Sequence, residues 1–169
     1  MNEQQKKLLN YALTLLAKRR FTIREMVRKL EARNRKSAQP CQDSELQLVL
    51  EKLVKSNFLN DQDYAYFFVE SRTNGNIYKP IGPHKIRAKL QQKGIDIEHI
   101  DQALQQADFN EQQMALDLLE RKIKSLDQTV LKQQKVQARL LRYLQNNGFS
   151  MNICYKTLQS KIASFHSHD

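Results

Sequence analysis

Basic side chains gather in one short segment near the start of the sequence, between residues 18 and 36. At 3.6 residues per turn, Arg24, Arg28 and Arg35 line one stripe of a helix, opposite Met26 and Leu30. A positive field of this kind attracts polyanions, and nucleic acid above all. The segment therefore predicts a nucleic-acid contact. Its candidate binding residues are Lys18, Arg19, Arg20, Arg24, Arg28, Lys29 and Arg35.

The net charge of +10 is spread unevenly along the 169 residues. Residues 1–60 hold 13 Lys and Arg against 6 Asp and Glu, residues 61–108 hold 6 against 7, and residues 109–169 hold 9 against 5. The last part offers a second set of candidate contacts, Lys135, Arg139 and Arg142. The alternative to nucleic-acid contact is a solvated helix face, held by pairs such as Arg24 with Glu31.

No pattern of residues points to catalysis, to a metal or to a cofactor. Asp61 and Asp96 are explained as favourable charges at helix starts. His84 and His99 do not stand at metal-ligand spacing with any cysteine, and no Gly-x-x-x-x-Gly-Lys phosphate loop is present. We therefore expect a binding protein and not an enzyme, with no catalytic residue, no metal and no cofactor.

The elements that must position the basic residues can be predicted from an internal repeat. Residues 90–104 return, 54 residues later, as residues 144–158, with Gly94 matching Gly148. Glycine at the end of a helix takes the left-handed conformation without a steric penalty, and the apolar residue after it, Ile95 or Phe149, closes the turn. The repeat predicts an all-α fold built as an array of three three-helix modules, at residues 1–58, 59–108 and 109–169.

Helix starts are marked as clearly as helix ends. Asn60 and Asn110 have the residue type and the position of N-caps. Thr22 and Glu25 form the Thr-x-x-Glu pattern of a capping box, and Phe21 stands at the spacing of a hydrophobic staple with Met26. The glycine-apolar ending is absent from the first module, and its place is filled by a polar loop. The last module has a longer connection at about Ser125–Thr129.

Composition suggests where the chain works. No apolar stretch approaches the roughly 18 residues of a membrane span, and the first residues lack a signal-like apolar region. Cys41 and Cys154 follow no pairing pattern, so we expect free thiols in a reducing cytoplasm.

The motifs resemble those of the RecX family, the bacterial regulators of the RecA recombinase. The resemblance is carried by Phe68–Arg72, by Gly82–Ile95 with Pro83 in a first helical turn, and by Lys135–Leu144 followed by Gly148 and Phe149. It covers nearly the whole chain, with the motifs in the right order. Residues 73–81 are longer than the family pattern suggests, which leaves the contacts of that loop open.

The resemblance implies tandem three-helix modules in an elongated, curved molecule that binds as a monomer in the groove of the RecA–DNA filament. It also implies inhibition of the ATPase, strand-exchange and coprotease activities of RecA, and hence a role in DNA repair and the SOS response. Both single- and double-stranded DNA are expected partners, and a membrane is not. Several modest contacts along a repeating filament would add through effective concentration.

Two further interpretations stay open. Three-helix modules with a turn before the last helix are also typical of helix-turn-helix transcription regulators, although residues 97–106 and 151–161 offer few basic side chains for base readout. Aromatic side chains could stack on bases. Tyr78, beside Lys79, is the best candidate for stacking, and Tyr66 and Tyr143 are further possibilities, whereas core packing explains the other aromatic side chains better.

Overall fold

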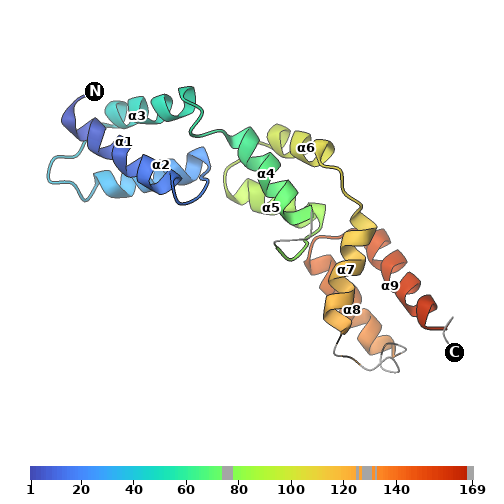
Figure 1. Cartoon of the computed structure of the whole chain (residues 1–169). Coiled ribbons are helices and arrows are strands. Elements are labelled where there is room, and N and C mark those ends of the chain that lie inside the picture. The colour runs from blue at the N-terminus through green and yellow to red at the C-terminus, as the bar shows by residue number, and fades with distance from the viewer. Residues whose placement is uncertain (74–77, 125, 127–130, 132, 167–169) are drawn as a thin grey trace. The chain divides into compact units, whose positions relative to one another are not determined.

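The structure is a computed structural model that describes residues 1–73, 78–124, 126, 131 and 133–166. Over these residues the chain forms nine α-helices and no strand, which confirms the predicted all-α fold (Figure 1). Much of the predicted long loop at 73–81, and most of the connection at Ser125–Thr129, lie outside the described residues. The helices are α1 (Glu3–Leu16), α2 (Ile23–Asn34), α3 (Asp43–Lys55), α4 (Asp61–Thr73), α5 (Pro83–Gln92), α6 (Ile97–Gln106), α7 (Glu111–Ile123), α8 (Gln134–Asn146) and α9 (Met151–His166).

The chain divides into two compact units, and both include parts of the middle of the sequence. The first unit comprises Met1–Ala65 and Leu90–Asp101, and the second comprises Tyr66–Lys89 and Gln102–Asp169. The helices α4, α5 and α6 therefore each contribute to both units. The predicted boundaries of three modules, and the predicted elongated array, stay predictions.

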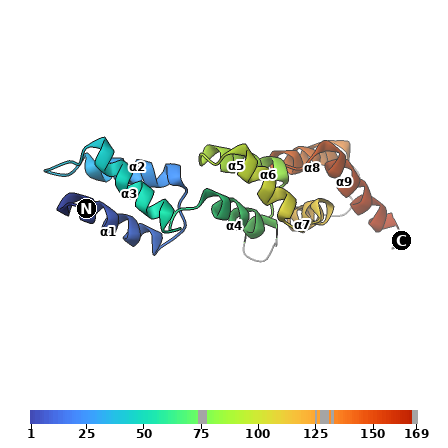
Figure 2. The same cartoon turned by 90° about the horizontal axis from the view of Figure 1, so that it is seen from above.

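The core of the first unit lies between α1, α2 and α3, which lie side by side in both views (Figures 1 and 2). Ala12 of α1 is fully buried, as are Met26 and Leu30 of α2 and Val49 of α3. Phe21 is buried in the same cluster as Met26, as the predicted staple requires. The apolar stripe of α2 thus faces inward, which directs its basic residues outward.

The core of the second unit lies between α7, α8 and α9 (Figure 2). Ala115 and Leu118 of α7, Leu144 of α8 and Cys154 of α9 are completely buried. Burial of its thiol raises the pKa of Cys154 to about 11, with a contribution from the Glu111 carboxylate. Cys41 is also buried, and both cysteines are free thiols.

Glycine ends two of the helices in the predicted way. Gly94 and Gly148 have φ values of 83° and 90°. The amide of Ile95 donates to the Leu90 carbonyl at 3.1 Å, and the amide of Phe149 donates to the Leu144 carbonyl at 3.4 Å. These are the 6→1 bonds of Schellman endings.

A third ending of this kind was not predicted. Asn57 follows α3 with φ 56°, and the amide of Phe58 donates to the Leu53 carbonyl at 2.9 Å. The first module thus has a left-handed ending, at its third helix and with asparagine in place of glycine. Asparagine tolerates this conformation better than most residues, but it is a weaker sequence signal than glycine.

The predicted N-caps are confirmed. The side chain of Asn60 accepts from the Asp63 amide at 3.1 Å, and that of Asn110 accepts from the Gln113 amide at 3.0 Å. Thr22 and Glu25 form the reciprocal bonds of a capping box at the start of α2. The helix that carries Arg24, Arg28 and Lys29 therefore begins at a fixed point.

Candidate nucleic-acid interface

The basic residues of α2 lie on its solvent side. Arg24, Arg28 and Lys29 are exposed, whereas Met26 and Leu30 are completely buried. Arg35, the C-cap residue of the same helix, is exposed too. The predicted separation of a basic face from an apolar face is therefore confirmed, and the role of the basic face in nucleic-acid binding stays a prediction.

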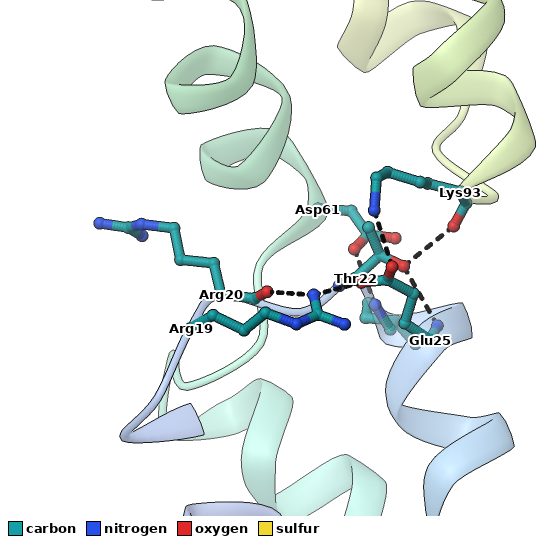
Figure 3. Close-up of polar contacts among 7 residues, drawn as sticks. Arg19, Arg20, Thr22, Glu25, Asp61 and Lys93 are labelled. Atoms are coloured by element: carbon teal, nitrogen blue, oxygen red, sulfur yellow. Dashed lines mark hydrogen bonds and ion pairs between the residues drawn. The ribbon is translucent and has the colours of Figure 1, made fainter. Parts of the chain in front are cut away.

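The loop before α2 carries the other three candidates of this segment. Lys18, Arg19 and Arg20 line a groove of about 390 Å³, together with Phe58 and Tyr64 among others. The Arg19 guanidinium is already engaged within the chain, because it lies 3.6 Å from the centre of the Phe21 ring and donates to the Arg20 carbonyl at 2.9 Å. In Figure 3 the side chain of Arg20 points away from these contacts.

A polar cluster fixes the start of α2 (Figure 3). Glu25 accepts from the Lys93 ammonium at 2.7 Å and from the Arg19 guanidinium at 3.2 Å. The Thr22 hydroxyl donates to the Lys93 carbonyl at 2.9 Å. Lys93 directly follows α5, so the cluster ties the start of α2 to the end of α5 within the first unit.

The electrostatics of this cluster favour the ionised pair. Burial alone would raise the pKa of Glu25, but the hydrogen bonds from Lys93 and from the Thr22 amide outweigh it, and the pKa of Glu25 lies below its ordinary value. Burial would likewise lower the pKa of Lys93, yet its contacts with Glu25 and Tyr64 raise it. Each shift stabilises the charged form of its group.

Asp61 connects the start of α4 to the start of α2. Its carboxylate accepts from the Ile23 amide at 2.9 Å, so the first residue of α4 satisfies a free amide at the start of α2. Burial raises the pKa of Asp61, and the bond from Ile23 only partly offsets this effect. The sequence indicated that Asp61 favours its own helix start, and the structure adds this longer-range role.

Arg24 is exposed at its charged end but packed along its stem. A Cβ atom added to Gly94 would lie 2.2 Å from Cδ of Arg24. The glycine that ends α5 therefore leaves room for the aliphatic part of Arg24. Long basic side chains commonly cover apolar or backbone surface in this way while the charged group stays in water.

The second unit has a corresponding junction between α5 and α8. The Gly82 amide donates to the Asn147 carbonyl at 2.7 Å, and the His84 amide donates to the Gly148 carbonyl at 3.2 Å. Lys85 Nζ donates to the Asn146 carbonyl at 2.8 Å. As in the first unit, the start of one helix meets the residues at and just after the end of another, and the glycine after the ended helix allows the close approach.

The candidates of the last module are exposed on α8. Lys135, Arg139 and Arg142 are all exposed, whereas Leu140 and Leu144 of the same helix are buried. The structure adds basic residues that the sequence did not single out, because Lys79 and Lys122 both approach the ring of Tyr143 on α8. Their sequence distance from Tyr143 gave no signal for this grouping.

The ring of Tyr78, the best stacking candidate in the sequence, is in contact with a cation. Tyr78 is exposed, and the Arg72 guanidinium lies 4.3 Å from the centre of its ring. The same guanidinium lies 5.3 Å from the centre of the Phe68 ring. Tyr66 donates a hydrogen bond to Glu70 at 3.2 Å, which raises the pKa of Tyr66.

The described residues contain no group of three or more His, Cys, Asp or Glu side chains that could hold a metal ion. In the same part of the chain, no helix has the length and apolar character that crossing a bilayer requires. What the arrangement can do chemically is bind anions at exposed Lys and Arg side chains, through charge-assisted hydrogen bonds.

Known proteins are similar to this chain in both sequence and fold. Family models described as the second and third three-helix domains of RecX match residues 60–104 and 110–158. The chain is 31% identical to "Regulatory protein RecX" of Chlorobium phaeobacteroides over 94% of this chain and 96% of that protein. It is 28% identical to the protein of the same name from Clostridium botulinum, over 96% of this chain and 76% of that protein.

A crystal structure of RecX from Lactobacillus salivarius has the same fold, with a TM-score of 0.75 over 96% of this chain and 99% of that chain, at 22% identity. Some relatives are longer, since the match spans between 40% and 61% of the proteins from Streptococcus uberis, Clostridium beijerinckii and a further Clostridium botulinum strain. Two matched domains and near-complete coverage of the Chlorobium relative together place the whole sequence in one family. The chain belongs to the RecX family.

Proposed function

We propose that this chain is a negative regulator of the RecA recombinase that binds the RecA–DNA filament. It inhibits ATP hydrolysis, strand exchange and coprotease activity, and thereby modulates DNA repair and the SOS response. Membership of the RecX family carries the proposal, because relatives matched over most of their length are named regulatory proteins. In this proposal the chain acts in the cytoplasm, as a monomer and without catalysis of its own.

The exposed basic residues support a role in contact with nucleic acid. Lys and Arg side chains are exposed on α2 in the first unit and on α8 in the second. Charges of this kind bind phosphates without reading sequence, which suits a filament assembled on any DNA. A sequence-specific transcription regulator would instead need base-reading side chains on its recognition helix. On α9 Lys161 is paired with Glu120 at 2.6 Å, so of the two lysines of that helix only Lys156 lacks this pairing.

The experiment is DNA-dependent ATP hydrolysis by RecA on single-stranded DNA, with this protein added from substoichiometric to equimolar amounts. The expected result is slower hydrolysis and slower strand exchange, with no turnover of nucleotide or DNA by this chain alone. Footprinting on random and selected duplexes separates the two functions, because a transcription regulator protects a defined site. Unchanged RecA activity at excess protein would contradict the proposal.

A further inference from the structure

Two lysines from different elements meet at one tyrosine in the second unit. Lys79 Nζ, from the segment before α5, lies 4.9 Å from the centre of the Tyr143 ring. Lys122 Nζ, from α7, lies 5.4 Å from the same centre. Both distances are within the range of a cation–π interaction, so both ammonium groups lie beside the same ring. Two positive charges beside one ring attract an anion to this part of the surface.

Further positive charge adjoins this pair. Burial lowers the pKa of Lys85, and the nearby charges of Lys89 and Lys79 lower it further. The Lys85 ammonium is held in place by the carbonyl of Asn146 at 2.8 Å. Lys79 thus lies near both Lys85 and Tyr143, so the positive charge of Lys85 adjoins the charges at the Tyr143 ring.

Ion pairs with acidic side chains are absent from the described contacts of this cluster. Within the described part of the chain, Lys79, Lys85, Lys89 and Lys122 form no ion pair with an acidic side chain. Four carboxylates of the second unit have other contacts. Glu70 accepts from Tyr66, Glu111 from the Ser150 amide, Asp117 from Gln113, and Glu120 from Lys161.

The position of Tyr143 on α8 links the cluster to the predicted contacts of the last module. Arg139 stands four residues before Tyr143, and Lys135 stands four residues before Arg139. Residues four apart on a helix lie on the same face, one turn apart. The exposed Arg139 and Lys135 therefore continue along α8 from the ring that collects the two lysines.

We propose that Lys79, Lys85, Lys122 and Tyr143 form a binding site for the phosphodiester backbone of a single nucleic-acid strand. Lys79 and Lys122 contact phosphate oxygens, and Lys85 adds charge from its fixed position. The Tyr143 ring positions the two ammonium groups, and its hydroxyl is available to donate to a phosphate, as Tyr hydroxyls do at protein–DNA interfaces. The site deepens the proposed function and rests on it only for its biological setting.

The continuation of positive charge along α8 favours a nucleic-acid strand over an acidic protein segment, because the repeated phosphates of a strand can contact successive basic side chains. The charges of the site are lysine ammonium groups, which bind phosphate as compact point charges. Arginine binds carboxylate and phosphate alike through its planar fork, and Arg139 stands one turn of α8 before Tyr143. An acidic protein partner is accordingly the competing outcome.

The test is binding of the full chain to a fluorescent single-stranded oligonucleotide across a series of salt concentrations, without RecA. Each phosphate contact contributes about 0.7 to the salt slope for a single strand, so the double variant Lys79→Gln/Lys122→Gln should lower the slope by about 1.4. The matched control is Lys6→Gln/Lys156→Gln, which removes the same charge at two exposed lysines outside the site. The control should change the slope by much less.

Two substitutions of Tyr143 separate the role of the ring from that of the charge. Tyr143→Phe keeps the ring and should retain most of the affinity, whereas Tyr143→Leu removes the cation–π contacts and should shift binding toward that of the double lysine variant. Circular dichroism confirms that each variant is folded. A poly-glutamate peptide, titrated in parallel, should bind more weakly than the oligonucleotide and show little difference between variants.

The site would be overturned if the wild-type chain did not bind the oligonucleotide. It would also be overturned if the double lysine variant had the same salt slope as its control variant. Loss of peptide binding without loss of DNA binding would assign the cluster to a protein partner instead. Because RecA is absent from this assay, failure here leaves the regulatory proposal intact. Failure of the RecA assay likewise leaves this site standing.

Discussion

Lys93 Nζ lies 2.7 Å from Glu25 Oε1, across 68 residues of sequence. The Lys93 side chain is 27% exposed and the Glu25 side chain is 23% exposed, so the pair is only partly screened by water. Glu25 is at the same time the third residue of α2 and the acidic half of its capping box. One carboxylate thus serves a local helix start and a contact with the end of a distant helix.

The first prediction isolates the ion pair from the cap. Glutamine also completes a capping box, so Glu25→Gln keeps the local bond and removes the charge. We expect a loss of about 1.5–3 kcal/mol in the free energy of unfolding, the range typical of a hydrogen bond to a charged group. Urea denaturation measures it. Glu31→Gln, at an exposed glutamate of the same helix, is the control and should stay within about 0.5 kcal/mol of wild type.

The second prediction concerns acid. The pKa of Glu25 is lower in the folded chain than its ordinary value of 4.5, so the folded state favours the ionised carboxylate. This stabilisation is fully present above pH 4.5 and is lost as the pH falls through the folded pKa. The stability difference between wild type and Glu25→Gln should therefore shrink in acid. A difference that stays constant from pH 7 to pH 3 would contradict the assignment.

Asp61 should behave in the opposite way. Burial raises its pKa, so the folded chain disfavours its charge, and protonation stabilises the folded state as the pH falls. Asp61→Asn keeps an oxygen that can accept from the Ile23 amide and removes the charge. We expect this variant to be more stable than wild type at pH 7 and equal to it below the ordinary pKa of 3.8. A variant that is less stable at pH 7 would show that the charge itself is favourable there.

Two glycines should differ in their tolerance of alanine. A Cβ atom at Gly82 would lie 2.3 Å from the Gly148 carbonyl oxygen, which belongs to the backbone and has little room to move. At Gly94 the clash is with the flexible side chain of Arg24, and the main penalty is the positive φ of 83°.

We expect Gly82→Ala to cost about 2–3 kcal/mol through the close backbone approach. Gly94→Ala should cost about 1–2 kcal/mol through its left-handed conformation. Adding Arg24→Ala to each variant distinguishes the causes, because it can relieve only the Gly94 contact. Equal effects of Arg24→Ala on both variants would mean that the two junctions are not built as described. Urea denaturation again provides the measurement.

The exposed face of α2 gives the last prediction. Replacing Arg24, Arg28 and Arg35 with Gln should reduce the salt slope of DNA binding by roughly one unit for each phosphate that the variant no longer binds. Stability should change little at all three positions, because Gln keeps the Cβ, Cγ and Cδ atoms through which Arg24 lies beside Gly94. The charge-matched control changes the exposed Lys6, Lys52 and Lys55 to Gln. An unaltered slope in the triple arginine variant would mean that α2 presents only a solvated face.

Local signals made much of the fold predictable. Thr22, Asn60, Gly94 and Gly148 each act on a helix within a few residues of themselves, and the structure confirms all four. Asn57 was missed because asparagine occurs in many other settings besides the left-handed helix ending.

The sequence could predict the candidate site only where its residues lie on a single helix. The exposed arginines of α2 share one helical period, so their common face could be read from spacing. The contacts of Thr22 with Lys93 and of Lys79 with Tyr143 join residues from different helices or loops, far apart in sequence. No periodicity within a helix connects such pairs, and only the packing of the chain brings them together.

The junction at Gly82 has a consequence for the order in which the chain becomes structured during translation. The amides of Gly82 and His84 find their acceptors at Asn147 and Gly148, which leave the ribosome more than 60 residues later. Until then these two acceptors are missing. The start of α5 therefore completes these hydrogen bonds only after residues 147 and 148 have been synthesised.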